Sequence, residues 1–167
     1  MENELIFKET QRFNQVWVWI LLALINAPAF IIIIYQRYNG IPMGDIPVSN
    51  AELVISTITS LLIIVLFLVT RLETMINKDG IYVRFYPFQP NYMVFTWDKI
   101  STAFVRQYDP IAEYGGWGLR FGLFGRGKAF NISGNKGLQL VFHDGTKLLI
   151  GTQKPEELSE ILKRIGK

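Results

Sequence analysis

Residues 16–35 read VWVWILLALINAPAFIIIIY, an apolar run of twenty residues without a single charge. A helix of this length spans about 30 Å, which matches the hydrocarbon thickness of a bilayer. A signal peptide is the alternative. However, three glutamates precede the run against one lysine and one arginine, and the run continues past its Ala-Pro-Ala stretch without a cleavage signal. The run therefore predicts a transmembrane helix over residues 16–35.

A second apolar run covers residues 51–70 and predicts a second transmembrane helix. Ser49 and Glu52 stand three residues apart at its start, which is the spacing of a capping box. Residues 36–50 between the two runs contain several glycines and prolines and predict a short external loop. The two helices are expected to form a hairpin.

The distribution of Lys and Arg near the helix ends predicts the orientation of this hairpin. Five cations lie on the side of the termini and one, Arg37, lies on the loop side. The positive-inside rule then places both termini, including residues 1–15, in the cytoplasm. We expect a multi-pass protein of the inner (cytoplasmic) membrane. The five cations are Lys8, Arg12, Arg71, Lys78 and Arg84.

Composition excludes several kinds of site. The chain has no cysteine and one histidine, so thiolate chemistry and histidine metal centres are not expected. Residues 71–167 carry 14 Lys and Arg against 9 Asp and Glu, which is only mildly basic. That balance suits an anionic membrane surface and is too weak for nucleic acid. We expect no cofactor, no metal ion and no nucleic-acid partner.

After residue 70 the hydrophobic period changes. We expect residues 71–76 to extend the second helix by a turn or two, and a β domain to follow. Alternating and apolar segments separated by turn residues predict seven short antiparallel strands. These segments are 81–86, 92–98, 102–108, 117–124, 128–133, 138–143 and 147–151.

The chain ends in a predicted amphipathic helix that begins near Pro155. Leu158, Ile161, Leu162 and Ile165 form one apolar stripe. Such a helix can cover the open end of a small barrel. The predicted fold is thus a membrane hairpin followed by an all-β barrel, over residues 71–167, with a C-terminal capping helix.

Three segments of this domain resemble bacterial pleckstrin-homology-like (PH-like) domains: 79–83 (DGIYV), 97–100 (WDKI) and 145–158 (GTKLLIGTQKPEEL). Small bacterial membrane proteins join such a domain to a two-helix hairpin. The resemblance covers residues 72–167 and the layout of the hairpin. It implies a PH-like barrel that serves as a docking platform for proteins or lipid headgroups, and it supplies no catalytic residues.

The segment from Asp109 to Arg120 contains glycines, aromatic residues and charges at high density. One interpretation is structural, with a glycine-rich bend that places Trp117 in the core and pairs Glu113 with Arg120. The other is a recognition loop, because Tyr, Trp and Arg are enriched at interface hot spots. The candidate partner-binding residues are Asp109, Glu113, Tyr114, Trp117 and Arg120.

Residues 122–128, GLFGRGK, match the spacing of a phosphate-binding P-loop. Ala129 stands where that motif requires Ser or Thr, and a strand is predicted where it requires a helix. A β-turn with two cations is the better interpretation. Arg126 and Lys128 are therefore candidates for contact with anionic lipid.

Three classes of function remain after these exclusions. A membrane-tethered interaction or scaffold protein is favoured, including a small subunit of a membrane complex, with a protein partner or a second copy as ligand. A transporter or channel subunit is the alternative, although the cores of both runs lack the ionisable residues typical of transport paths. An enzyme is not expected, because no nucleophile, base or metal cluster is recognisable.

Overall fold

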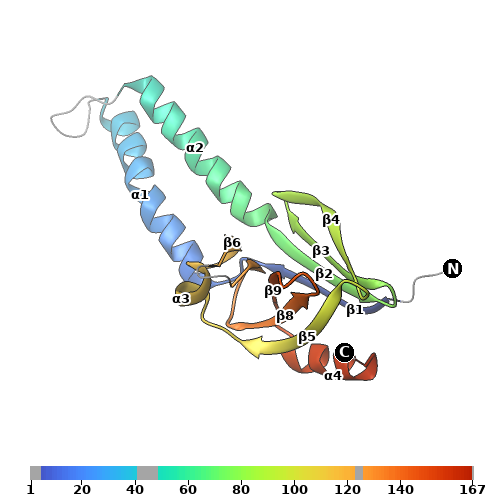
Figure 1. Cartoon of the computed structure of the whole chain (residues 1–167). Helices are drawn as coiled ribbons and strands as arrows, with labels where there is room; N and C mark the ends of the chain where they lie inside the picture. The colour runs from blue at the N-terminus through green and yellow to red at the C-terminus, as the bar shows by residue number, and fades with distance from the viewer. Residues whose placement is uncertain (1–4, 41–48, 123–125, 167) are drawn as a thin grey trace. The chain divides into compact units, whose positions relative to one another are not determined.

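The structure, a computed structural model, describes residues 5–40, 49–122 and 126–166. The chain divides into two compact units, and Figure 1 labels most of their elements. The β unit comprises residues 1–13 and 70–167, and the helical unit comprises residues 14–69. The helical unit is therefore inserted in the sequence of the β unit, near its N-terminus.

The helical unit contains helices α1 (Val16–Asn39) and α2 (Asn50–Val69), which contact each other. Among the described residues α1 alone is long and apolar enough to cross a membrane, by length and composition; the apolar stretch of α2, Val54–Val69, is shorter. The predicted capping box of α2 is confirmed. The amide of Ser49 donates to Glu52 Oε2 at 2.8 Å, and the amide of Glu52 donates to Ser49 Oγ at 3.2 Å.

The first sheet of the β unit is a four-stranded antiparallel meander in the order β1-β2-β3-β4. Buried and more exposed side chains alternate along β1 and β3, so that one face of the sheet lines the core and the other faces outward. The strands are β1 (Leu5–Arg12), β2 (Arg71–Asn77), β3 (Gly80–Tyr86) and β4 (Gln89–Thr96).

The second sheet has five strands in the order β5-β8-β9-β7-β6. Its strands are β5 (Ile100–Gln107), β6 (Gly118–Phe121), β7 (Lys128–Asn131), β8 (Lys136–Phe142) and β9 (Lys147–Gly151). The expectation of purely antiparallel pairing is wrong at one place, because β7 and β9 are parallel. In the described part of the chain no hydrogen-bonded ladder joins the two sheets, so the strands do not form a closed barrel.

All seven predicted strands are confirmed as β3 to β9, and the structure adds two strands before them. The expected helical extension over residues 71–76 is wrong, because this segment is strand β2. The segment alternates Leu72, Thr74 and Ile76 toward the core, and it finds partners on both sides in β1 and β3. Its partner β1 lies at the far end of the helical insertion, which is why the local sequence did not reveal the pair.

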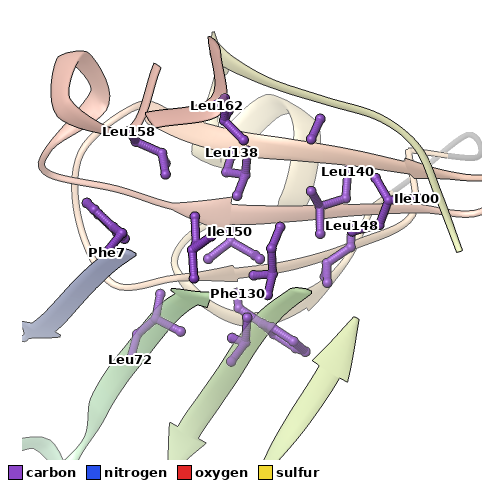
Figure 2. Close-up of a cluster of buried hydrophobic side chains, with 14 of the residues drawn as sticks. Phe7, Leu72, Ile100, Phe130, Leu138, Leu140, Leu148, Ile150, Leu158 and Leu162 are labelled. Carbon is purple, nitrogen blue, oxygen red and sulfur yellow. The ribbon is translucent and has the colours of Figure 1, made fainter. Parts of the chain in front are cut away.

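The core lies between the two sheets (Figure 2), where side chains from both sheets and from the C-terminal helix point toward one another. Phe7 of β1 is 2% exposed and belongs to this core, so the N-terminal strand is an integral part of the β unit. The labelled core residues are Phe7, Leu72, Ile100, Phe130, Leu138, Leu140, Leu148, Ile150, Leu158 and Leu162.

The predicted C-terminal helix is confirmed as α4 (Pro155–Arg164). Pro155 occupies its first turn, where the missing amide costs no helical hydrogen bond. Leu158, Ile161 and Leu162 are buried, and the helix packs on β5, β8 and β1. It covers one end of the space between the sheets, as the apolar stripe predicted.

Two buried polar side chains of β1 form hydrogen bonds with the end of β9 and with the segment that leads from β9 to α4. Glu9 accepts hydrogen bonds from Thr152 Oγ1 at 2.6 Å and from the amide of Gln153 at 2.7 Å. Gln11 Nε2 donates to the carbonyl of Gly151 at 2.6 Å. Burial raises the pKa of Glu9, although the hydrogen bonds from Thr152 and Gln153 act in the opposite direction. The first strand thus joins the two sheets through side chains where the backbone does not.

Replacing Phe7 tests whether the N-terminal strand is part of the folded β unit. Phe7→Ala should lower the free energy of unfolding of the full chain by about 3–5 kcal/mol, because it leaves a cavity between the sheets. Thr10→Ala changes an exposed side chain of the same strand and should shift it by less than about 0.5 kcal/mol. Denaturant unfolding in detergent measures both. Equal stability of the two variants would contradict the placement of β1.

Candidate functional site

The segment that sequence reasoning selected as a recognition loop forms a short helix, α3 (Pro110–Tyr114), with well-defined ends. Asp109 caps its N-terminus, since Oδ1 accepts from the amides of Ile111 and Ala112, each at 2.9 Å. Gly115 ends it at φ +70°, a conformation that other residues rarely adopt. Asp109 therefore has a structural role in the turn.

Glu113 is the centre of an ion-pair network on this helix. Arg106 of β5 donates to both of its carboxylate oxygens, at 3.1 and 2.7 Å, and Arg126 lies 3.0 Å from Oε2. The amide of Asp109 donates to Oε1 at 3.0 Å. The hydrogen bonds from Arg106, with those from Asp109 and Arg126, lower the pKa of Glu113 to about 2 against the opposing effect of burial. The carboxylate stays ionised and joins α3 to the second sheet.

The expected ion pair between Glu113 and Arg120 does not form. Arg120 is exposed, and its Nε donates to the carbonyl of Trp117 at 2.8 Å. Sequence reasoning missed Arg106 as the partner of Glu113, because the pair is set by the path of β5 and not by the local spacing. Arg106 Nε also donates to Gln139 Oε1 of the neighbouring strand at 3.0 Å, which fixes the guanidinium.

The structure reverses the roles expected for the two aromatic residues of this segment. Tyr114 is 3% exposed and packs edge-on against Tyr108, with 6.0 Å between ring centroids. Trp117 is only half-buried, and its Nε1 donates to the carbonyl of Gly134 at 3.1 Å. Tyr114 is therefore the core residue, and its removal should destabilise the unit more than removal of Trp117.

Part of the predicted recognition loop still faces outward. Ile111 is 68% exposed, and Trp117 lines a cavity of 390 Å³ together with residues at the start of α3. Arg120 is exposed beside it. Of the five predicted partner-binding residues, Asp109, Glu113 and Tyr114 hold the loop together, whereas Trp117 and Arg120 lie where a partner can reach them.

A larger cavity, of 730 Å³, lies at another edge of the β unit. Its described lining residues come from β4, from the end of β6, from β7 and from the β8–β9 hairpin, and we call it the phenylalanine groove. The rings of Phe95 and Phe142 contact each other in a tilted arrangement, with 5.5 Å between their centroids. Its apolar lining consists of Met93, Phe95, Phe121, Phe130, Phe142 and Leu148.

Cations border the phenylalanine groove. Phe121 is 76% exposed, and the ammonium of Lys128 lies 5.6 Å from the centroid of its ring. Lys147 also lines the groove. Asp144, the one carboxylate among the described lining residues, accepts hydrogen bonds from the amide and the hydroxyl of Thr146, at 2.9 and 2.6 Å. The groove is thus apolar with a positive border.

The backbone at the groove requires glycine at position 127. Gly127 has φ +82°, and a Cβ there would lie 2.1 Å from the carbonyl oxygen of Lys147. The glycine therefore lets the chain pass close to β9 before β7 begins. Lys128 starts a strand, as predicted, so the helix that a P-loop requires is not present at this place.

The predicted contact of Arg126 and Lys128 with lipid stays a prediction. Arg126 is half-exposed at its side chain while it pairs with Glu113, and Lys128 is exposed. Both remain accessible to an anion from solvent.

Among the described residues no group of three or more His, Cys, Asp or Glu side chains is placed to hold a metal ion. The perturbed carboxylates Glu73 and Glu113 each bind arginines, which is the arrangement of a structural ion pair.

Compared with family models, curated proteins and solved structures, the chain matches none.

The depressed pKa of Glu113 makes a pH-dependent contribution to stability. This contribution is complete above the ordinary glutamate pKa of 4.5 and is lost as the pH falls toward about 2. Glu113→Gln should lower the free energy of unfolding at pH 7 by about 1–2 kcal/mol, allowing for solvent screening. The difference from the unmodified chain should shrink between pH 4.5 and pH 2.

Thermal unfolding of the full chain in detergent across this pH range measures the effect. Glu156→Gln is the control, because Glu156 pairs with Lys136 at 3.1 Å with both side chains exposed, and it should change stability little. A pH-independent difference for Glu113→Gln would show that the carboxylate is not held ionised by its arginines.

Proposed function

We propose that this chain is a membrane-tethered interaction or scaffold protein whose PH-like β unit binds a protein partner at the cytoplasmic face of the inner membrane. In this proposal α1 and α2 both span the bilayer, and the chain is an accessory subunit of a membrane complex. The observation that carries the proposal is the phenylalanine groove, an open apolar cavity of 730 Å³ with a positive border.

The connection of the two units supports a tether with two attachment points. Strand β1 ends at Arg12, four residues before α1 begins, and β2 begins at Arg71, two residues after α2 ends. A hairpin inserted between two paired strands returns the chain to the side from which it left. Tethering confines the β unit to the bilayer surface and raises its effective concentration for membrane partners.

The PH-like assignment rests on the resemblance of the sequence together with the arrangement of elements. Two sheets enclose one core, and a C-terminal helix covers one end of it. The phenylalanine groove lies apart from this helix, because none of its lining residues belongs to α4. Folds of this general kind serve many functions, so the proposal depends on the groove and not on the fold.

The lining of the groove indicates the chemistry of the partner. Phe121, with three quarters of its surface exposed, can bury a large apolar area when an apolar side chain enters. Lys128 and Lys147 favour acidic groups next to that side chain. We therefore expect a partner segment in which acidic residues flank an apolar anchor.

The segment from Asp109 to Arg120, which we call the α3 loop, is a second candidate surface for a partner. It presents the exposed Ile111, the half-buried Trp117 and a cavity of 390 Å³. Aromatic and arginine side chains on such a surface are typical of interface hot spots, and Trp117 and Arg120 supply both.

Cysteine accessibility tests the membrane topology, because the chain has no native cysteine. Asn135→Cys and Glu160→Cys should be protected from a membrane-impermeant thiol reagent in intact cells. Gly44→Cys, which lies outside the described residues, should be labelled. Labelling of residue 135 with protection of residue 44 would invert the orientation and remove the proposed cytoplasmic role.

Affinity purification of the full chain from native membranes tests the partner surface. Phe121→Asp should reduce recovery of the co-purifying protein at least about tenfold, because a carboxylate replaces the apolar contact in the groove. Ile111→Asp is the matched control, since it places the same carboxylate at an exposed apolar position of the α3 loop. Loss with Ile111→Asp alone would move the site to the α3 loop, and no loss with either variant would contradict both surfaces.

A further inference from the structure

The outward face of the β1–β4 sheet carries an unusual concentration of cations. The strand register shows which outward-pointing side chains are neighbours, and it arranges them in three rows that run across the strands. Arg12, Arg71 and Tyr86 form the first row, and Thr10, Glu73 and Arg84 form the second. The third row contains Lys8, Met75, Tyr82 and Val94. These three rows contain four cations and one carboxylate.

The pairing of Arg12 with Arg71 stands out on this face. The two residues are direct partners in the β1–β2 ladder, and like charges opposite each other destabilise a sheet. Arg12 is exposed and forms no ion pair with a described carboxylate. Glu73 pairs with Arg71, so Arg12 is the member of the pair whose charge is uncompensated, at an exposed position that an anion can reach.

Neighbouring side chains hold Arg71 in a defined position. Its Nε lies 2.7 Å from Glu73 Oε1, and its guanidinium lies 5.1 Å from the ring centroid of Tyr86. Glu73 is itself fixed by hydrogen bonds from Arg84 and Tyr92. Burial raises the pKa of Glu73, but these donors and the nearby arginines outweigh it, so the pKa lies below the usual range. The carboxylate therefore orients Arg71 without reaching Arg12.

The position of the pair in the chain brings it close to the membrane helices. Arg12 precedes the first residue of α1 by four residues, and Arg71 follows the last residue of α2 by two. A fully extended chain covers at most about 3.6 Å per residue, so the two Cα atoms lie within about 14 and 7 Å of the helix ends. This limit holds for any relative placement of the two units.

We propose that Arg12 and Arg71 form a binding site for the phosphate of an anionic membrane lipid headgroup. The inference rests on the proposed membrane tether, which places the helix ends at the bilayer surface. Guanidinium groups bind phosphate oxygens in pairs through parallel hydrogen bonds. Two guanidinium groups on adjacent strands can meet one phosphate from two sides, and the phosphate removes the repulsion between them.

A membrane lipid is the favoured source of the phosphate, because Arg12 and Arg71 are only a few residues from the ends of α1 and α2. Headgroup phosphates are present at high local density near the helix ends, and the inner leaflet carries a negative surface potential. Tyr82 and Tyr86 on the same face suit the membrane interface, where an aromatic ring with a polar end is favoured. Lys8 and Arg84 add positive charge nearby.

Native mass spectrometry of the full chain, purified in an uncharged detergent, tests the site. The unmodified chain should retain added phosphatidylglycerol in preference to phosphatidylcholine. Arg12→Gln should weaken phosphatidylglycerol binding about tenfold, because it removes one guanidinium from the phosphate. Arg12→Lys keeps the charge and should lose less of the phosphatidylglycerol binding.

The melting temperature without lipid is a second measurement. Arg12→Gln should melt at the same temperature as the unmodified chain or higher, because the like-charge pair is gone.

Two control variants separate this site from general electrostatic attraction. Arg37→Gln removes a cation at the other end of α1, and the double variant Arg126→Gln with Lys128→Gln removes the other candidate lipid contacts. Both should retain selective phosphatidylglycerol binding. An equal loss in Arg12→Gln and either control would overturn the proposal, as would undiminished binding in Arg12→Gln.

A soluble competitor identifies the source of the phosphate. Glycerol 3-phosphate at millimolar concentration should not displace the lipid, and displacement would show a site for a free phosphate instead. Recovery of the protein partner should be unchanged in Arg12→Gln, since that binding depends on Phe121. Failure of the lipid site and failure of the proposed partner binding are therefore distinguishable.

Discussion

The pairing of β1 with β2 is the constraint on which the rest of the structure depends. It joins residues 5–12 to residues 71–77 across the whole helical insertion. Loop-closure entropy grows only slowly with loop length, so a helical unit of this size is a tolerable insertion between paired strands. In return the ladder brings Phe7 to the core and pairs the residues that flank the helical unit in the sequence.

The ladder also explains why the β unit holds together without a closed barrel. The backbone hydrogen bonds of the ladders lie within each sheet, and side-chain contacts connect one sheet to the other. Gln11 binds the last residue of β9 and Glu9 binds the two residues that follow it, while α4 packs on β5, β8 and β1. Burying a carboxylate is costly, and the hydrogen bonds from Thr152 and Gln153 offset part of that cost for Glu9.

Two glutamates organise the arginines on the outer surfaces of the two sheets. Glu113 holds Arg106 and Arg126 on the second sheet, and Glu73 holds Arg71 and Arg84 on the first. Each carboxylate fixes more positive charge than it neutralises. These four arginines are therefore held in defined orientations, which favours selective recognition of anionic groups over diffuse attraction.

Several features could be predicted from the sequence because they depend on neighbours along the chain. The apolar run from residue 16, the Ser49–Glu52 cap, the strands β3 to β9 and the apolar stripe of α4 all follow from period and capping, which are local properties. Tertiary structure decided the rest. Residues 71–76 became a strand because β1 and β3 offered hydrogen-bonding partners. Tyr114, not Trp117, entered the core, because α3 turned it toward Tyr108. Glu113 found Arg106 because β5 passes beside α3. Each of these choices depends on groups that meet only after folding, so no local pattern carried them.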